Sequence, residues 1–469
     1  MKTRRFICYI LIFSLALSIS PTTYASQKDD RAIVGSGLQG TDPLVEDPEM
    51  LKSTKAAIAY EINTDTLLYA KNPDKRVNPT GLVKLLTALI VLERADLNEL
   101  ATVHRNTLDS IALGAVSAGL KAGEKVSLGD LLKCVMVASA NDAAAVMAAH
   151  VAGSQNAFVE LMNQRAKELG CTDSNFTNVH GLMDENQYST ARDLAIIVEA
   201  ALKNEAFVEL FSLESFTMPA TEQSAEREFR TTNYMMNAKS QYYDYRVTGG
   251  KPAAATSSDR SVICTAQVGK SRYLFVLMSV ECEVTEQGGV TYSNFYETIR
   301  LMNFAFNNYT VRQVLDCTQA IYQYAVKDGK NDVMVSPSID VSVLLPVDFD
   351  KNAVIYENKV DASVLKSTIQ AGDYLGTIQI KYAGRILAVC DLLAMNDVVQ
   401  KEDIEIKERV DVSNTNDKQT IDPELLSRVI VAAVLVIMVA GLVFVVCGLI
   451  KLRNRRLYMR NVKKRKRSR

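Results

Sequence analysis

The sequence predicts an α/β domain followed by a small all-β domain and a C-terminal transmembrane helix, and three observations support this. Apolar strand-like segments stand before and after a long helical stretch, which indicates one sheet built from both ends of the first domain. Apolar residues then alternate with period two between residues 333 and 400. Finally, Val429–Ile450 holds 22 residues without a charge. As a helix this segment is about 33 Å long, which is enough to cross a bilayer.

Both ends of the chain carry membrane-targeting features. A basic start, the apolar stretch Phe6–Ser18 and the small residues of Thr23–Ala25 predict a signal peptide at 1–25, with a retained N-terminal anchor as the alternative. Residues 451–469 hold eleven cations and no acid, which places this tail in the cytoplasm and favours anionic membrane lipid as its neighbour. We therefore expect a single-pass protein of the cell membrane whose domains are extracytoplasmic.

Charge and cysteine content narrow the function classes. The whole chain has a formal charge of −1, and the cations of the two ends leave −15 on residues 26–450, which excludes a nucleic-acid binder. Six cysteines lie between the signal peptide and the membrane helix, and their spacing fits no metal site, so we expect no metal and no cofactor. Most should be buried thiols, although Cys264 and Cys282 lie on successive predicted strands and could pair.

The predicted elements follow in chain order. Residues 26–50 are mostly polar and predict a flexible lead. Ala56–Ile62 and Leu67–Ala70 flank a polar turn and predict a hairpin, and the helix that contains Lys84 follows directly. Apolar residues at i, i+3 and i+4 predict further helices at Leu128–Ala138, Asp142–Ala152, Ala157–Leu169 and Ala191–Leu202. Strand signals return at Ser261–Ala266 and Tyr273–Val280.

These elements define the predicted domain organisation. Residues 51–310 form the first domain and residues 311–400 the β domain. Charged and polar residues at 401–428 predict a stalk, which leads to the membrane helix at 429–450 and the basic tail at 451–469.

The segment Asn78–Ala88 carries the first candidate site residues. Pro79 precedes an apolar run with helical spacing, so Lys84 is predicted one turn into a buried helix. A lysine is rarely buried in this way without a partner or a chemical task. Three residues earlier, on the same helix face, stands Gly81.

Two later segments supply further polar groups. Ser139-Ala140-Asn141 follows an apolar helix and offers a hydroxyl beside an amide, which suits a site that relays a proton and holds a substrate amide. The same pattern is also common in turns and helix caps. Lys251 lies in the second segment, about ten residues before the strand that begins near Val262.

In this order and spacing, the three segments resemble the motifs of the D-alanyl-D-alanine carboxypeptidases, the low-molecular-mass penicillin-binding proteins of serine peptidase family S11. The resemblance runs from about residue 51 to about residue 400, and its further marks are Phe158–Asn163, Phe176–Leu182 and Tyr188–Leu194. It implies a β-lactamase/transpeptidase-like domain, in which helices flank an antiparallel sheet. It also implies that the substrate is the D-Ala-D-Ala end of a peptidoglycan stem peptide.

The resemblance assigns roles residue by residue. Lys84 stands at the position of the general base, Ser139 and Asn141 stand in the second motif, and Lys251 stands at the carboxylate-binding lysine. Gly81 stands at the position of the nucleophilic serine. Because glycine has no side chain, no acyl-enzyme can form there.

The third motif also departs from the family pattern. Lys-Thr-Gly is replaced by Lys251-Pro252-Ala253, so only the lysine remains. Proline removes a hydroxyl and a backbone donor, and alanine adds a methyl group where the substrate backbone would lie. The oxyanion hole would use the backbone N–H groups of Gly81 and Ala254, which do not depend on these side chains.

Three functions therefore remain open. The first is a non-catalytic, membrane-anchored wall protein that binds stem peptides or a cell-wall protein. The second is an active D-alanyl-D-alanine carboxypeptidase with an unrecognised nucleophile, for which Thr80 is the nearest hydroxyl, although Thr80 is more typical of a helix N-terminus. The third is a purely structural scaffold. We expect His180 to be structural, and His104 and His150 to be surface or core residues.

Overall fold

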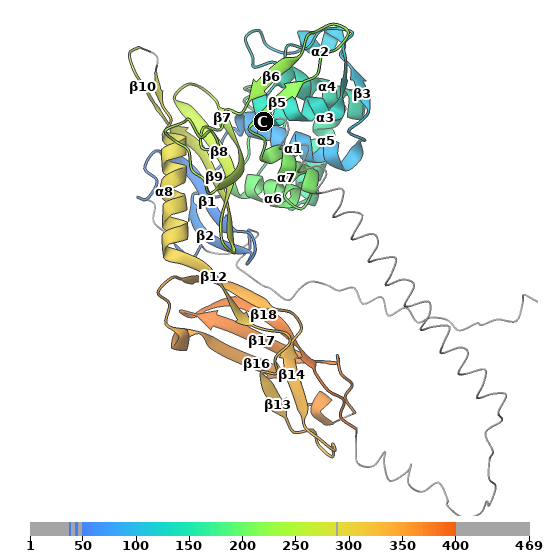
Figure 1. Ribbon diagram of the computed structural model, residues 1–469, viewed down its shortest axis with the longest axis vertical. Coiled ribbons are helices and arrows are strands. Elements are labelled where there is room, and N and C mark those ends of the chain that lie inside the picture. The colour runs from blue at the N-terminus through green and yellow to red at the C-terminus, as the bar shows by residue number, and fades with distance from the viewer. Residues whose placement is uncertain (1–36, 39–42, 46–48, 288, 367, 400–469) are drawn as a thin grey trace, which may run out of the picture. The chain divides into compact units, whose positions relative to one another are not determined.

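The computed structural model describes residues 37–399 except 39–42, 46–48, 288 and 367 (Figure 1). The predicted signal peptide, stalk, membrane helix and basic tail lie outside the described residues. Within the described part of the chain, no helix is both long enough and apolar enough to cross a membrane.

A five-stranded antiparallel sheet forms the centre of the first domain. Its strands lie in the order β2-β1-β9-β8-β7, so the first hairpin of the chain pairs with strands that follow the helices (Figure 1). The prediction of one sheet built from both ends of the domain is confirmed. The five strands are β1 (Thr54–Glu61), β2 (Thr66–Lys71), β7 (Val247–Ala254), β8 (Asp259–Val268) and β9 (Ser271–Glu281).

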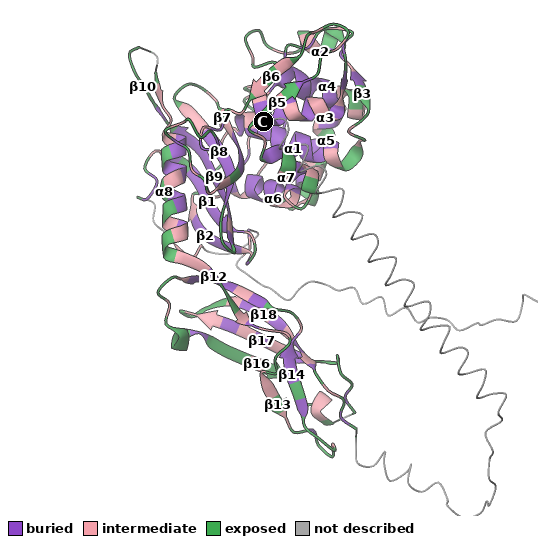
Figure 2. Cartoon of the chain, in the orientation of Figure 1, coloured by how far each residue is buried: buried purple, intermediate pink, exposed green. Residues whose placement is uncertain are grey.

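Helices cover both faces of this sheet because its strands are apolar on both sides. Ile58 and Val276 belong to one core, which they share with most of the helices, whereas the adjacent Ala57 and Phe275 belong to a second core with α8. Figure 2 shows the central strands of this sheet mostly in the colour of buried residues. The helices are α1 (Val83–Arg94), α2 (Arg105–Asp109), α3 (Leu128–Lys133), α4 (Asn141–Ala152), α5 (Gln155–Glu168), α6 (Ala191–Ala201), α7 (Glu205–Phe211) and α8 (Ser293–Asn308).

Three two-stranded antiparallel sheets complete the first domain. They are formed by β3 (Leu100–Thr102) with β4 (Lys125–Ser127), β5 (Ser215–Met218) with β6 (Arg227–Arg230), and β10 (Glu283–Val284) with β11 (Val290–Thr291). The predicted helices at 142–152, 157–169 and 191–202 match α4, α5 and α6 closely. The predicted helix at 128–138 is instead α3 followed by one π-helical turn, Cys134–Ala138, which brings the chain to Ser139.

The second domain is all-β, as predicted. One sheet has the order β13-β14-β18-β17-β16, and β12 pairs separately with β15. The period-two pattern places alternate residues such as Ile378 and Ile380 in a common apolar core. The strands are β12 (Tyr309–Leu315), β13 (Tyr322–Tyr324), β14 (Val333–Pro337), β15 (Val341–Pro346), β16 (Ile355–Val360), β17 (Tyr374–Tyr382) and β18 (Arg385–Ala394).

The six cysteines of the described residues are all free thiols and five of them are buried, which agrees with the expectation of buried thiols. The pairing of Cys264 with Cys282, which the sequence left open, is not present. Part of the predicted flexible lead is attached to the sheet: the backbone N–H groups of Leu44 and Val45 donate to the carbonyls of Leu67 and Leu68 at 3.0 and 2.9 Å.

A buried ion pair fixes the loop that precedes β4. The carboxylate of Glu124 is fully buried and pairs with Arg227 on β6, and Arg227 also donates to the carbonyl oxygens of Ala118 and Gly119. Further hydrogen bonds reach Glu124 from the backbone N–H of Lys121 at 2.9 Å and the hydroxyl of Thr221 at 2.8 Å. Removal of the guanidinium would therefore leave a charge in a site that water cannot reach.

We expect Arg227→Met to lower the free energy of unfolding by about 3–5 kcal/mol, because the Glu124 carboxylate would lose its partner inside the protein. Chemical denaturation measures this loss. The matched control is Arg230→Met on the same strand, where the Arg230–Glu228 pair is largely exposed and should contribute less than about 1 kcal/mol. Equal losses for the two variants would contradict this account of the loop.

Candidate active site

A cleft of about 420 Å³ lies between the edge strand β7 and the helical part of the first domain. It is lined by five of the six residues that the sequence singled out, namely Gly81, Lys84, Ser139, Asn141 and Ala254. The cleft therefore brings together, at one place, segments that are up to 173 positions apart in the chain, from Gly81 to Ala254.

The position of the absent side chain faces the polar groups of the cleft. A Cβ atom at Gly81 would lie 3.4 Å from Ser139 Oγ, 3.5 Å from the Cβ of Ala253 and 3.9 Å from Lys84 Nζ. These are ordinary contact distances, so the space beside Gly81 could hold a small side chain without displacement of its neighbours. Position 81 therefore has room for a small side chain beside Lys84 and Ser139 but provides no side-chain atom itself.

Lys84 is held by two oxygen atoms at the bottom of the cleft. Its side chain is 2 % exposed, and Nζ donates to Asn141 Oδ1 at 2.8 Å and to the backbone carbonyl of His180. Burial, together with the nearby charge of Lys251, holds the pKa of Lys84 well below its usual range, although Asp142 acts in the opposite direction. The lowered pKa favours the neutral amine form of Lys84.

Ser139 and Asn141 are presented by the end of the π-helical turn. Ser139 has a left-handed backbone, with φ of 61°, and α4 begins two residues later. The side-chain amide of Asn141 donates to the carbonyl of Val116 at 2.9 Å while its oxygen accepts from Lys84. Asp142 accepts from the backbone N–H groups of Ala118 and Leu120, which holds the loop at the cleft wall.

Lys251 occupies a different place from the other predicted residues. Its side chain is 1 % exposed, it is not among the residues that line the cleft, and Nζ donates to the carbonyls of Val135 and Met136 at 2.8 and 3.4 Å. Burial lowers the pKa of Lys251 to about 7. In this structure Lys251 connects β7 to the π-helical turn, and its predicted role as a carboxylate ligand stays a prediction.

Arg260 is a cleft residue that sequence reasoning missed. It lies on β8 opposite Ala254, its guanidinium is 4.7 Å from the centre of the Tyr292 ring, and its Nε donates to the carbonyl of Ser257 at 3.1 Å. Among the described residues, none accepts a hydrogen bond from its two terminal nitrogens. The sequence could have indicated Arg260 through the pairing of β7 with β8 across the turn at 255–258. The strand predicted from the sequence begins at Ser261, one residue after Arg260.

The His180–Gly181 turn packs tightly against the residues before α1. A Cβ atom at Gly181 would lie 1.9 Å from the carbonyl oxygen of Thr80, and Gly181 has φ of +81°. Thr80 itself has φ of 49°, which is unusual for a β-branched residue. Its buried hydroxyl makes no hydrogen bond to any described residue, including Lys84, so this geometry does not favour Thr80 as a nucleophile.

His180 is a structural residue of this turn, as expected. It is buried, and its Nδ1 accepts a hydrogen bond from the backbone N–H of Leu182 at 3.2 Å. Burial, with a contribution from the charge of Lys84, lowers the pKa of His180 to about 4, so the ring is neutral at physiological pH.

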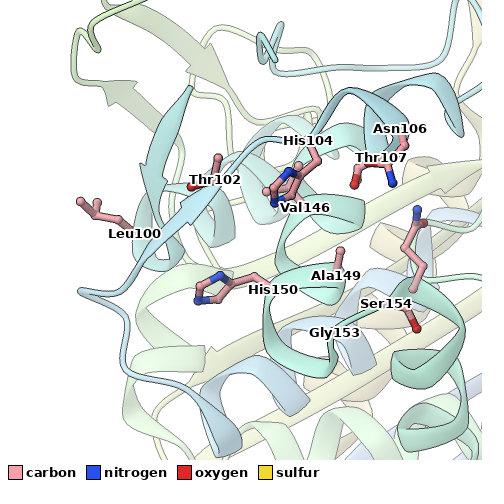
Figure 3. A pocket seen from close by; sticks show the side chains of 11 residues that line it. Leu100, Thr102, His104, Asn106, Thr107, Val146, Ala149, His150, Gly153 and Ser154 are labelled. Carbon is pink, nitrogen blue, oxygen red and sulfur yellow. The ribbon is translucent and has the colours of Figure 1, made fainter. Parts of the chain in front are cut away.

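A second cavity, of about 540 Å³, contains none of the predicted site residues. It lies among β3, α2, α4 and the start of α5, and its lining includes the side chains of His104 and His150 (Figure 3). His150 Nε2 lies 3.1 Å from Glu99 Oε2, and both histidines are exposed, so of the two expected places, surface or core, they occupy the surface.

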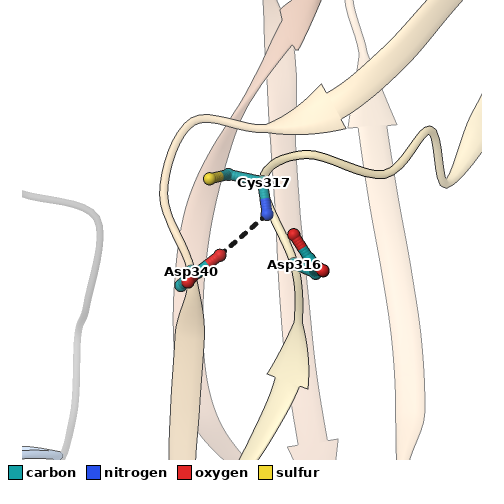
Figure 4. Close-up of side chains that lie close together, drawn as sticks. All are labelled: Asp316, Cys317 and Asp340. Carbon is teal, nitrogen blue, oxygen red and sulfur yellow. Dashed lines mark hydrogen bonds between the residues drawn. The ribbon is translucent and has the colours of Figure 1, made fainter.

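A cluster of potential metal ligands in the β domain has an explanation without a metal. Asp316, Cys317 and Asp340 offer ligand atoms within 4.8 Å of one another (Figure 4). The backbone N–H of Cys317 donates to Asp340 Oδ1 at 3.0 Å, and Asp316 accepts from Thr318 at 2.9 and 2.6 Å. These bonds close the turn after β12, so we assign the cluster to loop structure.

Two family models match the two domains of this chain. The model of the D-alanyl-D-alanine carboxypeptidase family, peptidase S11, matches residues 44–282, and the model of the penicillin-binding protein 5 C-terminal domain matches residues 309–400. The chain belongs to the D-alanyl-D-alanine carboxypeptidase family, so the predicted family is confirmed.

Individual relatives agree with this assignment. The chain is 27% identical to the D-alanyl-D-alanine carboxypeptidase DacF of Bacillus subtilis (strain 168) over 391 residues, covering 82% of this chain and 92% of the relative. It is 26% identical to DacC of Escherichia coli (strain K12), covering 75% and 85%. Penicillin binding protein 5 from Haemophilus influenzae has a similar fold, with a TM-score of 0.61 and 24% identity over 77% of this chain and 100% of that one.

Proposed function

We propose that this protein is a membrane-anchored cell-wall protein of the D-Ala-D-Ala carboxypeptidase family that has lost catalysis and binds peptidoglycan stem peptides. The observation that carries this proposal is Gly81, whose absent side chain would face Lys84 and Ser139. Without an oxygen or sulfur atom at this position, the acyl-enzyme step of a serine peptidase has no attacking group.

The rest of the cleft supports binding. The space beside Gly81 is open, and Lys84 and Ser139 lie in contact range of it. Asn141 accepts a hydrogen bond from Lys84. The backbone N–H groups of Gly81 and Ala254 do not depend on the lost side chains. A ligand carbonyl could therefore still be held at this point. A protein that lacks the serine can keep much of its binding because each of these contacts is made without covalent chemistry.

Arg260 supplies a positive charge for the carboxylate end of such a peptide. The replacement of Thr and Gly by Pro252 and Ala253 removes polar groups from the end of β7, and Arg260 lies beside that end on β8. Its stacking on Tyr292 and its bond to Ser257 hold the guanidinium while the terminal nitrogens lack described acceptors. A guanidinium with two such nitrogens can bind a carboxylate in a bidentate manner.

We expect Arg260→Gln to weaken binding of a soluble peptide ending in D-Ala-D-Ala by about 10- to 100-fold, as for the loss of one charge-assisted contact. Calorimetry or fluorescence anisotropy measures this change. Arg300→Gln is the matched control, because Arg300 is an exposed arginine of α8 that does not line the cleft.

A peptide with an amidated C-terminus separates the carboxylate contribution from other contacts. The wild type should prefer the free carboxylate, and Arg260→Gln should bind the two peptides equally. If neither peptide binds the wild type, the cleft is not the working part of the protein and the scaffold hypothesis is favoured instead.

The proposed location rests on the sequence outside the described residues. A signal peptide at 1–25, a spanning segment at 429–450 and the eleven cations of residues 451–469 favour extracytoplasmic domains, a single membrane crossing and a cytoplasmic tail near anionic lipid. In this location, a cell-wall protein is the alternative binding partner to the peptidoglycan stem peptide. Protease protection of the tail in intact cells, with digestion of the domains from outside, tests this topology.

A further inference from the structure

The hydrogen bonds of Lys84 match those of a neutral amine. A neutral amino group has two N–H donors and one lone pair, whereas an ammonium group has three donors. Among the residues that the structure describes, two accept hydrogen bonds from Nζ, through Asn141 Oδ1 and the carbonyl oxygen of His180. A neutral Lys84 would use both of its N–H donors in these two hydrogen bonds, and its lone pair would point away from them.

The charges around Lys84 favour the same form. Among the described residues, no carboxylate lies within ion-pair distance of Nζ, and the oxygens of the nearby Asp142 accept from Ser117, Ala118, Leu120 and Ala143. The charge of Lys251 lowers the pKa of Lys84 further, whereas Asp142 acts in the opposite direction, and the ring of His180 is neutral. Burial without a paired anion therefore works against protonation of Lys84.

The absence of a side chain at Gly81 opens a path to this amine. Lys84 lines the cleft although it is almost fully buried, and a Cβ atom at position 81 would lie 3.9 Å from Nζ. In an enzyme with serine at this position, the hydroxyl group would stand between the lysine and the ligand. Here a ligand carbonyl in the same space would meet the amine directly.

We propose that Lys84 is itself a nucleophile, a site of covalent modification by activated or strained acyl groups such as a β-lactam. The Nζ lone pair attacks the lactam carbonyl carbon, a C–N amide bond forms, and the ring C–N bond breaks. The released ring nitrogen takes up the proton that the amine gives up, so no further reactant is needed. The product is an amide, which does not hydrolyse on the time scale of an ester, so each molecule reacts once.

This modification takes place in the cleft of the proposed function, but it does not depend on the binding of stem peptides. Incubation of the full-length protein with benzylpenicillin, followed by intact and peptide mass spectrometry, tests it. We expect one adduct per chain, located on Lys84 and resistant to hydroxylamine, which cleaves esters. At pH 7 an ordinary surface lysine is neutral in fewer than about one molecule in a thousand, so Lys84 should react at least about tenfold faster than the other lysines.

Variants show whether the cleft directs the reaction. Lys84→Met should abolish the adduct, whereas Lys203→Met, which removes an exposed lysine of the same domain, should leave it unchanged. Gly81→Val keeps the amine but fills the space beside it, and we expect at least about a tenfold slower reaction. This second variant keeps the test valid if Lys84→Met fails to fold.

The outcomes separate this inference from the proposed function. No adduct, or an adduct spread over surface lysines, overturns the inference and leaves peptide binding unaffected. A hydroxylamine-sensitive adduct on a hydroxyl group overturns both, because it reveals an ester-forming nucleophile.

Discussion

Gly81→Ser alone is expected to restore little release of D-alanine from a D-Ala-D-Ala peptide, although the cleft has room for the serine. The new Oγ would lie close to Lys84 and Ser139, because a Cβ at this position is already 3.9 and 3.4 Å from their Nζ and Oγ atoms. However, the methyl group of Ala253 lies 3.5 Å from that Cβ, and Pro252 offers neither a hydroxyl nor a backbone N–H. The ligand would be held in a poor position for attack.

The triple variant Gly81→Ser/Pro252→Thr/Ala253→Gly should release D-alanine at least about 10²-fold faster than Gly81→Ser, since loss of one polar contact to the reacting groups commonly changes the rate by this factor. Adding Lys84→Met to the triple variant should abolish the gain, because the serine would lose its base. Full activity from Gly81→Ser alone would show that Pro252 and Ala253 are compatible with catalysis.

Gly181→Ala is expected to lower the free energy of unfolding by at least about 4 kcal/mol, an exceptionally large effect for one methyl group. Its Cβ would lie 1.9 Å from the carbonyl oxygen of Thr80 and 2.4 Å from the carbonyl carbon, so the backbone before α1 would have to move. The positive φ of Gly181 adds a second penalty. Urea denaturation measures the loss.

Gly153→Ala provides the matched control. Gly153 has nearly the same φ, +79°, but no atom lies within 4 Å of its would-be Cβ. Only the conformational penalty remains, and we expect a loss of about 1 kcal/mol. If the two variants lost equal free energy of unfolding, the close packing of the His180–Gly181 turn against Thr80 would be contradicted.

Much of the fold could be predicted because its patterns are local. The hairpin of β1 and β2, the amphipathic helices α4 to α6 and the alternating strands of the β domain each depend on residues a few positions apart. The π-helical turn before Ser139 could not be predicted in this way. Its residues continue the apolar pattern of α3, so the sequence does not mark where the α-helix ends. The carbonyls of Val135 and Met136 accept hydrogen bonds from Lys251, which lies far away in the chain.

A motif predicts the place of Lys84, Ser139 and Asn141, and the structure brings all three to one cleft, while their roles stay predictions. The sequence could not indicate positions that depend on pairing across the sheet. Lys251 keeps its place in the motif, but burial directs its amine towards the π-helical turn. Arg260 belongs to no motif and reaches the cleft only because β8 pairs with β7 at Ala254.

Release of D-alanine by the wild-type protein tests the central claim most directly. The full-length protein, purified in detergent, would be incubated with a D-Ala-D-Ala peptide and the free D-alanine measured beside a Lys84→Met control. The account predicts no release beyond one equivalent of D-alanine per chain for the wild type and none for Lys84→Met, because Gly81 provides no nucleophile for repeated turnover. Release beyond one equivalent by the wild type that disappears in Lys84→Met would contradict it and show that the cleft is an active carboxypeptidase.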